Sequence, residues 1–516
     1  MADRISGDRR LPVPVTAYGP LHLLASHVHR LANTGRAQEA LAAADAFLAI
    51  ADAVDDIRTA RFLVQGKMYA LLALGRSTEA HPYGVALLHA QRRAGSGPGE
   101  AKALCDLAQI NVLTGHYVDG MRNLARAGVL LDAGTADDDR HRSALCSFAE
   151  AATAAELYES AADAYEHLRH RSTSFDLVHA MTLLYWGLRL AHVGRTEEAR
   201  TRLRRSAEIT RERLDDQPDP TVTAVHALAL AKLGETTVAE KLARSVVVEL
   251  RAAGTHQYAR MAHLALGISL RAHGLLAESR REFIAARDLT EPGARPDELP
   301  IIRFELALTA LELDDGRPSR DLFEVVEGQV RELWQLRLQR LAMLRQARQR
   351  EETETARAHA EREVLRDPLT GLGNRRRFDV LLDGVSPVAE EPLTLLLIDV
   401  DHFKAVNDAY SHSAGDEALR QVAAILRAHC RAEDEAVRYA GDEFVIFLRG
   451  DVRAGGEVGE RIRTAVARTE IITSVRMTVS VGVAVWRPGM TGDQLFRAAD
   501  ERLYAAKWSG RNTTAV

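Results

Sequence analysis

The sequence predicts a multidomain protein in which an all-α helical-repeat region is followed by a linker helix and then by an α/β domain. Three observations support this prediction. The chain of 516 residues is too long for one compact core. A glycine-containing turn recurs at a regular interval through the first three hundred residues, which is typical of repeat architectures. Apolar runs that end in acidic pairs follow residue 366, as expected for buried strands.

The composition is that of a folded protein and excludes several classes of partner. The apolar fraction of 46% and the charged fraction of 27% lie in the globular range. A formal net charge of -5 gives no overall positive field, so we expect no nucleic-acid partner. No stretch approaches the roughly 18 apolar residues that a spanning helix needs, so we expect no membrane insertion and a cytoplasmic location. Three scattered cysteines, Cys105, Cys146 and Cys430, favour reduced thiols over disulfides.

The repeat region is assigned to residues 17–324, after an N-terminal tail at 1–16. Its turn glycines lie 40, 79, 40 and 40 residues apart: Gly75, Gly115, Gly194, Gly234 and Gly274. The long interval contains Ala155-Glu156-Leu157-Tyr158, which is in register but lacks the glycine. A last turn is expected near 314–316. Because one helix pair cannot bury its apolar face alone, neighbouring pairs are expected to stack.

The repeated turn also carries a family resemblance. Gly-Arg-Ser-Thr-Glu-Ala at 75–80 and Gly-Arg-Thr-Glu-Glu-Ala at 194–199 are similar to the turns of tetratricopeptide repeats. The period here is longer than the usual ~34 residues, and the proline that often separates repeats is mostly missing. The resemblance implies an α-solenoid that acts as a sensor and binds a protein or peptide ligand. A purely structural spacer is the alternative.

Residues 325–366 are predicted to form a helical linker, because they contain no proline and only one glycine, Gly328. Apolar residues recur at helical spacing, namely Leu333, Trp334, Leu338, Leu341 and Leu344. They are expected to form a partner-facing seam of a dimerising stalk as far as Ala347, after which little but alanine continues it. A coiled coil is therefore one option, and a solvated single helix is the other.

Two acidic pairs stand at the ends of predicted strands in the last domain. Residues 393–401 form a nearly continuous apolar run that is closed by Asp399 and Asp401. Residues 438–448 form two short segments around a small-residue turn, which predicts a β-hairpin with Asp442 and Glu443 at its tip. Carboxylates from adjacent strands can hold the divalent metal that phosphoryl transfer requires.

Five segments, in order and with the family's spacing, resemble the GGDEF family of diguanylate cyclases. They are Asp-Pro-Leu-Thr-Gly-Leu-Gly-Asn at 367–374, Asp-Val-Asp-His-Phe-Lys-Ala-Val-Asn-Asp at 399–408, Gly-Asp at 415–416, Ala-Gly-Asp-Glu-Phe at 440–444, and Ala-Asp-Glu-Arg-Leu-Tyr-Ala-Ala-Lys at 499–507. The resemblance implies that residues 367–516 form a nucleotidyl-cyclase-like domain with a mainly antiparallel central sheet. It also implies an enzyme that condenses two GTP into cyclic di-GMP.

The resemblance assigns a role to individual residues of this chain. Asp399 and Asp442 would bind Mg2+ or Mn2+ together with the Val400 carbonyl, and Glu443 would lie near the ribose 3'-hydroxyl. Asn407 and Asp416 would recognise the guanine edge, because Asp accepts hydrogen bonds that guanine can donate and adenine cannot. The triphosphate would be held by Lys404, Lys507, Arg511 and the main-chain amides of His402 and Phe403.

The resemblance further implies a homodimer, since the product contains two nucleotides, and feedback by cyclic di-GMP at an RxxD site formed by Arg431 and Asp434. The chain departs from the family's pattern at Ala440 and at Ser411, where glycines are usual. A methyl group at the turn would strain the backbone if a positive φ were required. The alternative to an active enzyme is therefore a degenerate module that binds GTP or cyclic di-GMP and signals through the repeats.

Overall fold

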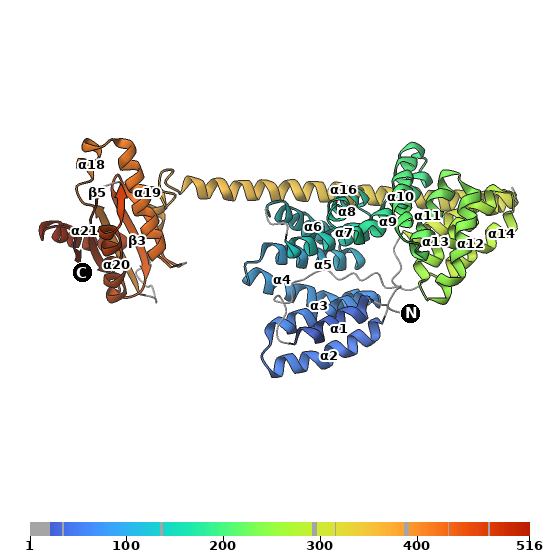
Figure 1. Cartoon of the computed structure of the whole chain (residues 1–516), viewed down its shortest axis with the longest axis horizontal. Coiled ribbons are helices and arrows are strands. Elements are labelled where there is room, and N and C mark those ends of the chain that lie inside the picture. Colours follow the sequence, from blue (N-terminus) through green and yellow to red (C-terminus); the bar gives the residue numbers. More distant parts are fainter. Residues whose placement is uncertain are drawn as a thin grey trace. The chain divides into compact units, whose positions relative to one another are not determined.

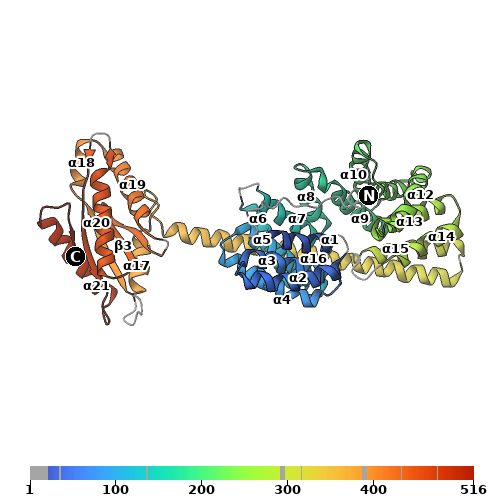
Figure 2. The same ribbon diagram turned by 60° about the horizontal axis from the view of Figure 1, so that its bottom comes forward.

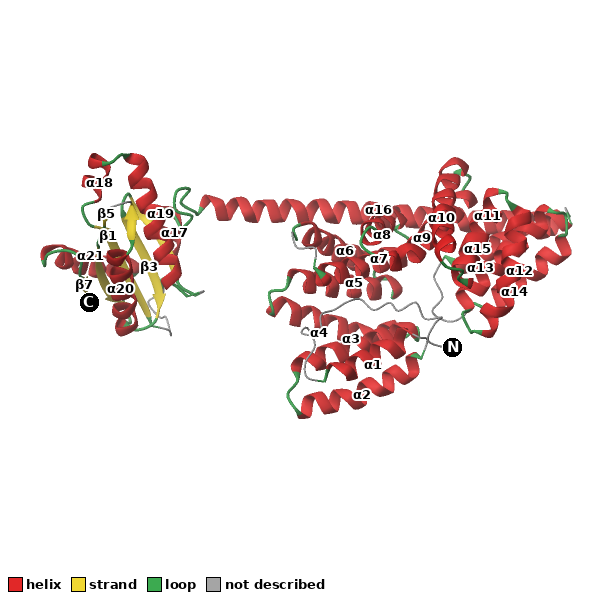
Figure 3. Ribbon diagram, viewed as in Figure 1, coloured by secondary structure: helices red, strands yellow, loops and turns green. Residues whose placement is uncertain are grey.

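The computed structural model describes residues 21–33, 36–134, 138–290, 297–314, 316–385, 392–431, 433–472 and 475–516, so the N-terminal tail assigned to 1–16 lies outside the described residues. The chain divides into two compact units, residues 1–353 and 354–516. We call them the helical unit and the sheet unit. The strands of the described chain all belong to the sheet unit (Figures 1 and 3).

The helical unit is built from helices that pack against their neighbours in sequence. Their bounds are α1 His22–Asn33, α2 Ala37–Ala53, α3 Ile57–Ala73, α4 Ser77–Arg93, α5 Gly97–Leu113, α6 Tyr117–Asp132, α7 Asp139–Ala154, α8 Tyr158–Arg169, the 3-10 turn η3 Thr173–Phe175, α9 Asp176–His192, α10 Thr196–Asp216, α11 Pro220–Leu233, α12 Thr236–Ala252, α13 His256–Ala272, α14 Leu276–Asp288, α15 Glu298–Leu313 and α16 Arg317–Val364. The last of these runs past the boundary between the two units.

The turns between helices lie where the repeated glycines stand. Gly75, Gly115, Gly194, Gly234 and Gly274 all have positive φ angles, between 73° and 96°. Glycine adopts this left-handed conformation without the steric cost that a side chain brings. Glu156, which replaces glycine in the irregular repeat, has a φ of 58°. A buried carboxylate therefore takes the backbone position that glycine occupies in the turns at 75, 115, 194, 234 and 274.

The linker helix α16 is one continuous helix, and its apolar face lies on the helical unit itself. Trp334 belongs to a hydrophobic core with residues of α9, α11 and α13. Leu341 and Leu344 belong to a second core with residues of α5, α6 and α7. Of the residues predicted to form a seam for a partner helix, Trp334, Leu338, Leu341 and Leu344 thus pack against the chain's own repeat helices. The reason is that the same apolar spacing serves either purpose, and the nearest apolar surface is intramolecular.

Two arginines attach α16 to the turn that contains Glu156. Arg337 is fully buried, its Nε donates to the Glu156 carbonyl oxygen at 2.9 Å, and its guanidinium pairs with Glu159. It also lies over the Trp334 ring, 4.4 Å from the centroid. Arg340 donates to the Ala155 carbonyl oxygen at 3.0 Å and to the Glu156 carboxylate at 3.1 Å. Buried arginines of this kind need such partners, because an unpaired buried charge is costly.

The sheet unit contains a five-stranded mixed sheet with helices on both faces. Its elements are α17 Arg375–Asp383, β1 Leu393–Val400, α18 Phe403–Ala409, α19 His412–His429, β2 Glu435–Ala440, β3 Glu443–Arg449, α20 Val452–Arg468, β4 Glu470–Ile472, β5 Val475–Arg476, β6 Val479–Val485, α21 Gly492–Trp508 and β7 Thr514–Ala515. The strand order is β2-β3-β1-β6-β7, in which only the β6–β7 pairing is parallel; β4 and β5 form a separate pair.

Alternation along β1 divides the core of this unit into two layers. Leu396 and Ile398 pack with α19 and α20 on one face, whereas Leu395 and Leu397 pack with α17 and α21 on the other. Figure 2 shows helices in front of and behind the strands. Since side chains alternate between faces along a strand, Asp399 belongs to the α21 face. None of the helices in the described part of the chain combines the length and the apolar character that a membrane span requires.

Candidate active site

The acidic residues predicted from the sequence meet at the end of the two central strands. Asp399 of β1 is the direct cross-strand partner of Glu443 in β3, so both side chains lie on the same face of the sheet. Asp442 lies in the turn between β2 and β3, next to Gly441, whose φ is +43°. The Val400 amide donates to the Asp442 carbonyl oxygen at 3.2 Å, which holds this turn against β1.

A lysine from α21 completes this cluster. Lys507 places its Nζ 2.7 Å from the Oδ2 atom of Asp399. Burial raises the pKa of Asp399 above its usual value, Lys507 opposes this change, and the nearby Asp442 adds to it. Burial and then the charge of Asp399 raise the pKa of Glu443. The site therefore concentrates negative charge that one ammonium group only partly offsets.

This charge distribution fits a cation held by Asp399 and Asp442. Asp399 and Asp442 both raise the pKa of Glu443, and Asp442 also raises that of Asp399. Magnesium is commonly bound by one or two carboxylates, with the other ligands supplied by substrate and water. No group of three or more His, Cys, Asp or Glu side chains arranged for a metal occurs among the described residues. Any ion at this site would therefore depend on oxygen atoms beyond the carboxylates of the protein.

The residues predicted to recognise the base lie on α18 and α19, which pack against each other. A β-carbon built on Gly415 would lie 2.0 Å from the Oδ1 atom of Asn407. Because Gly415 has no side chain, the Asn407 amide can lie against α19. Asp416 is the next residue of α19. Lys404 and Asp416 are exposed, and neither has an ion-pair partner within the described ranges. Both side chains are therefore available to a ligand.

The remaining predicted phosphate-binding residues lie on segments that follow β1 or α21. His402 precedes α18 with a φ of 56°, and Phe403 packs partly into the core. Arg511 follows α21 in an exposed turn with a φ of 62°. The structure thus brings Lys507 to the acids directly, whereas Lys404, His402 and Arg511 stand on segments that join β1 or follow α21.

The two departures from the family's pattern differ in their backbone conformation, since Ser411 has a φ of 159° whereas Ala440 has no positive φ. Ala440 ends β2 and is not among the described residues with positive φ, because the left-handed position falls on Gly441. The strain that an alanine would cause at a left-handed position therefore does not arise. Ser411 caps α19, and its hydroxyl accepts a hydrogen bond from the Ala414 amide at 3.2 Å. A serine at this place satisfies an amide that a glycine would leave to water.

A hollow of about 620 Å³ surrounds Arg431 and Asp434, and its lining includes none of the acids of β1 and β3. Asp434 accepts hydrogen bonds from the main-chain amides of Arg431 at 2.8 Å and Arg449 at 3.2 Å. Sequence reasoning missed three further arginines that line this hollow: Arg366, Arg377 and Arg427. They come from segments far apart in the chain, so only their convergence in the fold identifies them.

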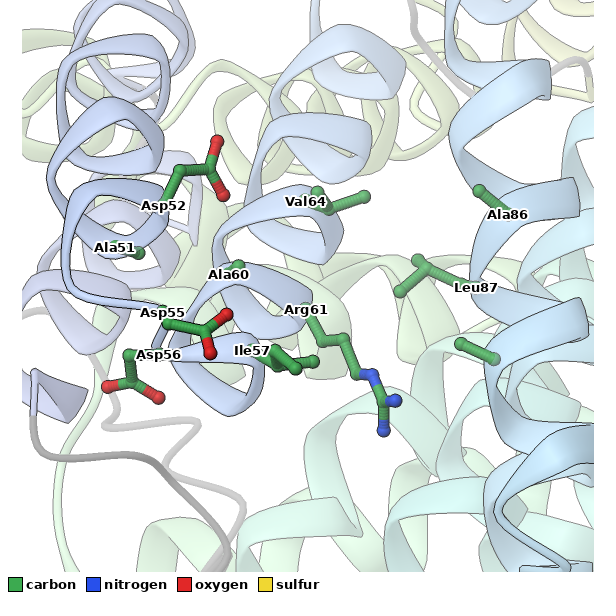
Figure 4. A pocket seen from close by; sticks show the side chains of 11 residues that line it. Ala51, Asp52, Asp55, Asp56, Ile57, Ala60, Arg61, Val64, Ala86 and Leu87 are labelled. Atoms are coloured by element: carbon green, nitrogen blue, oxygen red, sulfur yellow. The ribbon is translucent and has the colours of Figure 1, made fainter.

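A smaller hollow, of about 300 Å³, lies in the helical unit between the α2–α3 turn and α4. Figure 4 shows its side chains: Asp52, Asp55 and Asp56 border it on one side and Arg61 on another, over alanine, valine and leucine side chains. No pattern in the sequence predicts this hollow. Asp56 caps α3 through the Thr59 amide at 3.1 Å, so one of these acids already has a structural role.

Comparison with known proteins identifies the class to which the sheet unit belongs. Residues 364–513 match the family model described as "Diguanylate cyclase, GGDEF domain". This part of the chain is therefore a GGDEF domain of the diguanylate cyclase family.

Two curated relatives agree with this assignment. Diguanylate cyclase DgcS of Shewanella oneidensis is 38% identical over 149 residues, which cover 28% of this chain and 50% of that protein. Diguanylate cyclase DgcM of Escherichia coli is 40% identical over 151 residues, 28% of this chain and 37% of the relative. The crystal structure of the GGDEF domain of DgcB from Caulobacter crescentus, in complex with c-di-GMP, is 33% identical and covers 29% of this chain and 94% of that chain, with a TM-score of 0.27. The chain thus spans half or less of the length of the two curated cyclases, DgcS and DgcM.

Proposed function

We propose that the protein is a diguanylate cyclase, which condenses two GTP molecules to cyclic di-GMP and two pyrophosphates. The observation that carries this proposal is the cross-strand pair of Asp399 and Glu443 with Asp442 and Lys507 around it, in a domain that matches the GGDEF family. Residues 367–516 are assigned as the catalytic domain, 325–366 as the linker, and 17–324 as a sensor built from tetratricopeptide-like repeats.

Asp399, Asp442 and the Val400 carbonyl are the groups that would hold Mg2+ or Mn2+. When bound, a divalent ion neutralises phosphate charge and favours attack by an ionised hydroxyl. Burial, and to a lesser extent the charge of Asp442, raises the pKa of Asp399, and this supports the assignment because a bound cation would stabilise the ionised carboxylate. Lys507 forms an ion pair with the same carboxylate and would bind the phosphates of the nucleotide instead when GTP is present.

The other residues are proposed to bind and orient GTP. Glu443 has a raised pKa, which suits a group that accepts a proton from the ribose 3'-hydroxyl. Asn407 and Asp416 would read the guanine edge. Lys404, Arg511 and the main-chain amides of His402 and Phe403 would hold the triphosphate. Because each domain would bind one GTP and the product contains two, catalysis would require a homodimer in which the two 3'-hydroxyls face opposite α-phosphates.

Product feedback is proposed at the hollow around Arg431 and Asp434. Cyclic di-GMP carries two phosphates and two guanines, and the four arginines that border this hollow provide donors for both. Arg377 is paired with Glu435, and Arg427 donates to the Thr370 carbonyl oxygen at 3.0 Å. Arg366 and Arg431 are both exposed, and neither side chain has an ion-pair partner in the described part of the chain. These two are therefore the best placed for a ligand.

Regulation by the repeats is supported by the attachment of α16 to the helical unit. A protein or peptide that binds the repeats would alter the surface on which Trp334 and Leu341 pack, and α16 is a single helix that continues to Val364. Such a ligand would change the rate by changing how often two catalytic domains meet productively. Neither the ligand nor the sign of its effect is assigned.

Turnover by the purified full-length chain tests the proposal. The chain is incubated with GTP and Mg2+, and cyclic di-GMP and pyrophosphate are quantified beside the Asp442→Ala variant. We expect product from the wild type and at least a 100-fold loss in the variant, because one of two metal-binding carboxylates is gone. Asp493→Ala, which removes an acid from the first turn of α21, is the matched control. Binding of GTP without product would instead select the degenerate binding module.

A further inference from the structure

The turn that follows α21 has an uncommon backbone. Arg511 and Asn512 have φ angles of 62° and 44°, and both follow Gly510 at 112°. Two consecutive non-glycine residues in the left-handed region are rare, because the β-carbon crowds the backbone there. Such a conformation persists only where neighbouring groups hold it, and it is often found where a ligand is bound.

The carboxylate of Asp401 is one of the groups that hold this turn, beside Arg463, which donates to the Asn512 Oδ1 atom at 2.8 Å, and the Ala506 carbonyl oxygen, which accepts from the Arg511 amide at 3.2 Å. The Asp401 Oδ2 atom accepts hydrogen bonds from the Asn512 amide at 3.0 Å and the Thr478 hydroxyl at 2.7 Å. Its Oδ1 atom accepts one from the Ser480 hydroxyl at 2.7 Å. The residue is only 4% exposed, and no cation pairs with it among the described residues. Its three donors therefore come from β6, from the segment before β6, and from the turn that carries Arg511.

Asp401 also stands between two groups assigned to the nucleotide. Val400 precedes it in the chain, and the amide of Asp401 donates to the Thr478 carbonyl oxygen at 3.0 Å. His402, whose amide is assigned to the phosphates, follows it. A single buried side chain thus connects the end of β1 with the turn after α21. An asparagine at this position would keep the size but turn one of the two acceptor atoms into a donor.

We propose that Asp401 is a positioning residue of the GTP site: it fixes the left-handed turn that presents Arg511 to the triphosphate, in register with the end of β1. This inference rests on the proposed function, since it names what organises the phosphate side of the same site. It also explains why the strand ends in two acids, of which the first faces the ligand and the second faces the protein.

A double-mutant cycle in the full-length chain separates positioning from general structural support. Asp401→Asn, Arg511→Ala and the double variant are assayed for the KM and kcat of GTP turnover. We expect Asp401→Asn to raise KM about 10-fold with a smaller change in kcat, and to add less than about twofold to KM in the Arg511→Ala background. Effects that multiply in the double variant would overturn the inference, because Asp401 would then act independently of Arg511.

A rescue and a milder variant guard against simple loss of folding. Glycine adopts a left-handed φ without assistance, so adding Asn512→Gly to Asp401→Asn is expected to reverse at least part of the rise in KM. Thr478→Val removes one donor and should raise KM in the same direction but less. Asp451→Asn, a carboxylate that caps α20 through the Ala454 amide at 2.9 Å, is the matched control. Absence of rescue with unchanged KM in Thr478→Val would contradict the proposal.

The outcomes also distinguish this inference from the proposed function. A wild-type chain that neither binds nor converts GTP would overturn the proposed function and this inference with it. Wild-type turnover together with an unaltered KM in Asp401→Asn would overturn this inference alone.

Discussion

Asp399 and Glu443 face each other directly across the antiparallel pair β1–β3, so two carboxylates with raised pKa values share one face of the sheet. Like charges directly opposite each other destabilise a sheet. This arrangement is therefore a cost to the fold, and such costs are typical of sites that are built to bind a cation or a substrate.

Replacing Glu443 by Gln is expected to stabilise the protein at neutral pH. The free energy of unfolding should rise by about 0.2–1 kcal/mol, the range found for unfavourable cross-strand pairs. Because its pKa is raised in the folded state, the folded chain binds the proton more tightly than the unfolded chain. The destabilisation by ionised Glu443 is thus fully present above the raised pKa, and it is lost as the pH falls through the usual value of 4.5.

Urea unfolding of the wild type and Glu443→Gln between pH 4 and pH 8 measures this difference. The gain should be largest near neutrality and vanish at the acid end. Glu457→Gln on α20, which lies in an exposed pair with Arg453, is the control and should show no such dependence. A variant that is less stable than the wild type at pH 7 would contradict the expectation.

Gly415→Ala is expected to weaken GTP binding. Its β-carbon would lie 2.0 Å from the Asn407 Oδ1 atom, so the amide must move away from α19. We expect a rise in KM for GTP of about 10-fold, because lost hydrogen bonds to a base cost on the order of 1–2 kcal/mol. Discrimination against ATP should fall as well. Gly328→Ala in α16, where nothing lies within 4 Å of the new atom, is the matched control.

Arg431→Ala and Arg366→Ala are expected to weaken feedback by cyclic di-GMP. Each removes a guanidinium from the hollow of about 620 Å³. The concentration of cyclic di-GMP that halves the initial rate should increase at least 10-fold for Arg431→Ala and by a smaller factor for Arg366→Ala. Arg453→Ala, on the exposed surface of α20, should leave that concentration as in the wild type. Unchanged inhibition in Arg431→Ala would refute the assignment of this hollow.

Arg337→Ala is expected to loosen α16 from the repeats. The substitution removes a fully buried guanidinium and leaves the Glu156 carbonyl oxygen without its donor. Breaking a buried pair in this way costs about 3 kcal/mol. Hydrogen exchange of residues 325–347 should accelerate, and the thermal unfolding midpoint should fall. Arg357→Ala, whose pair with Glu361 is exposed, should change neither quantity measurably.

Much of this architecture could be predicted because its signals are local. The turn glycines at a regular interval mark left-handed positions, and that is where the structure has them. The apolar run before Asp399 and the turn before Glu443 specified a strand and a hairpin, and both are present. Their direct pairing follows from the antiparallel register, which the sequence alone does not fix.

Other features could not be predicted, because they depend on contacts between distant segments. Arg337 and Glu156 are 181 positions apart, and the amphipathic pattern of α16 does not reveal which surface it will cover. The same holds for Asp401, whose donor Asn512 lies 111 positions further along the chain. Periodicity identifies a buried face, whereas the identity of its neighbour is a property of the tertiary fold.

The left-handed glutamate at position 156 bears on any attempt to idealise the repeats. A designer who averages the copies would write glycine there, and the hairpin would form more easily as a result. The same edit would delete the carboxylate that Arg340 binds. A glycine at position 156 would therefore make the repeat more regular but would weaken the contact between this turn and α16.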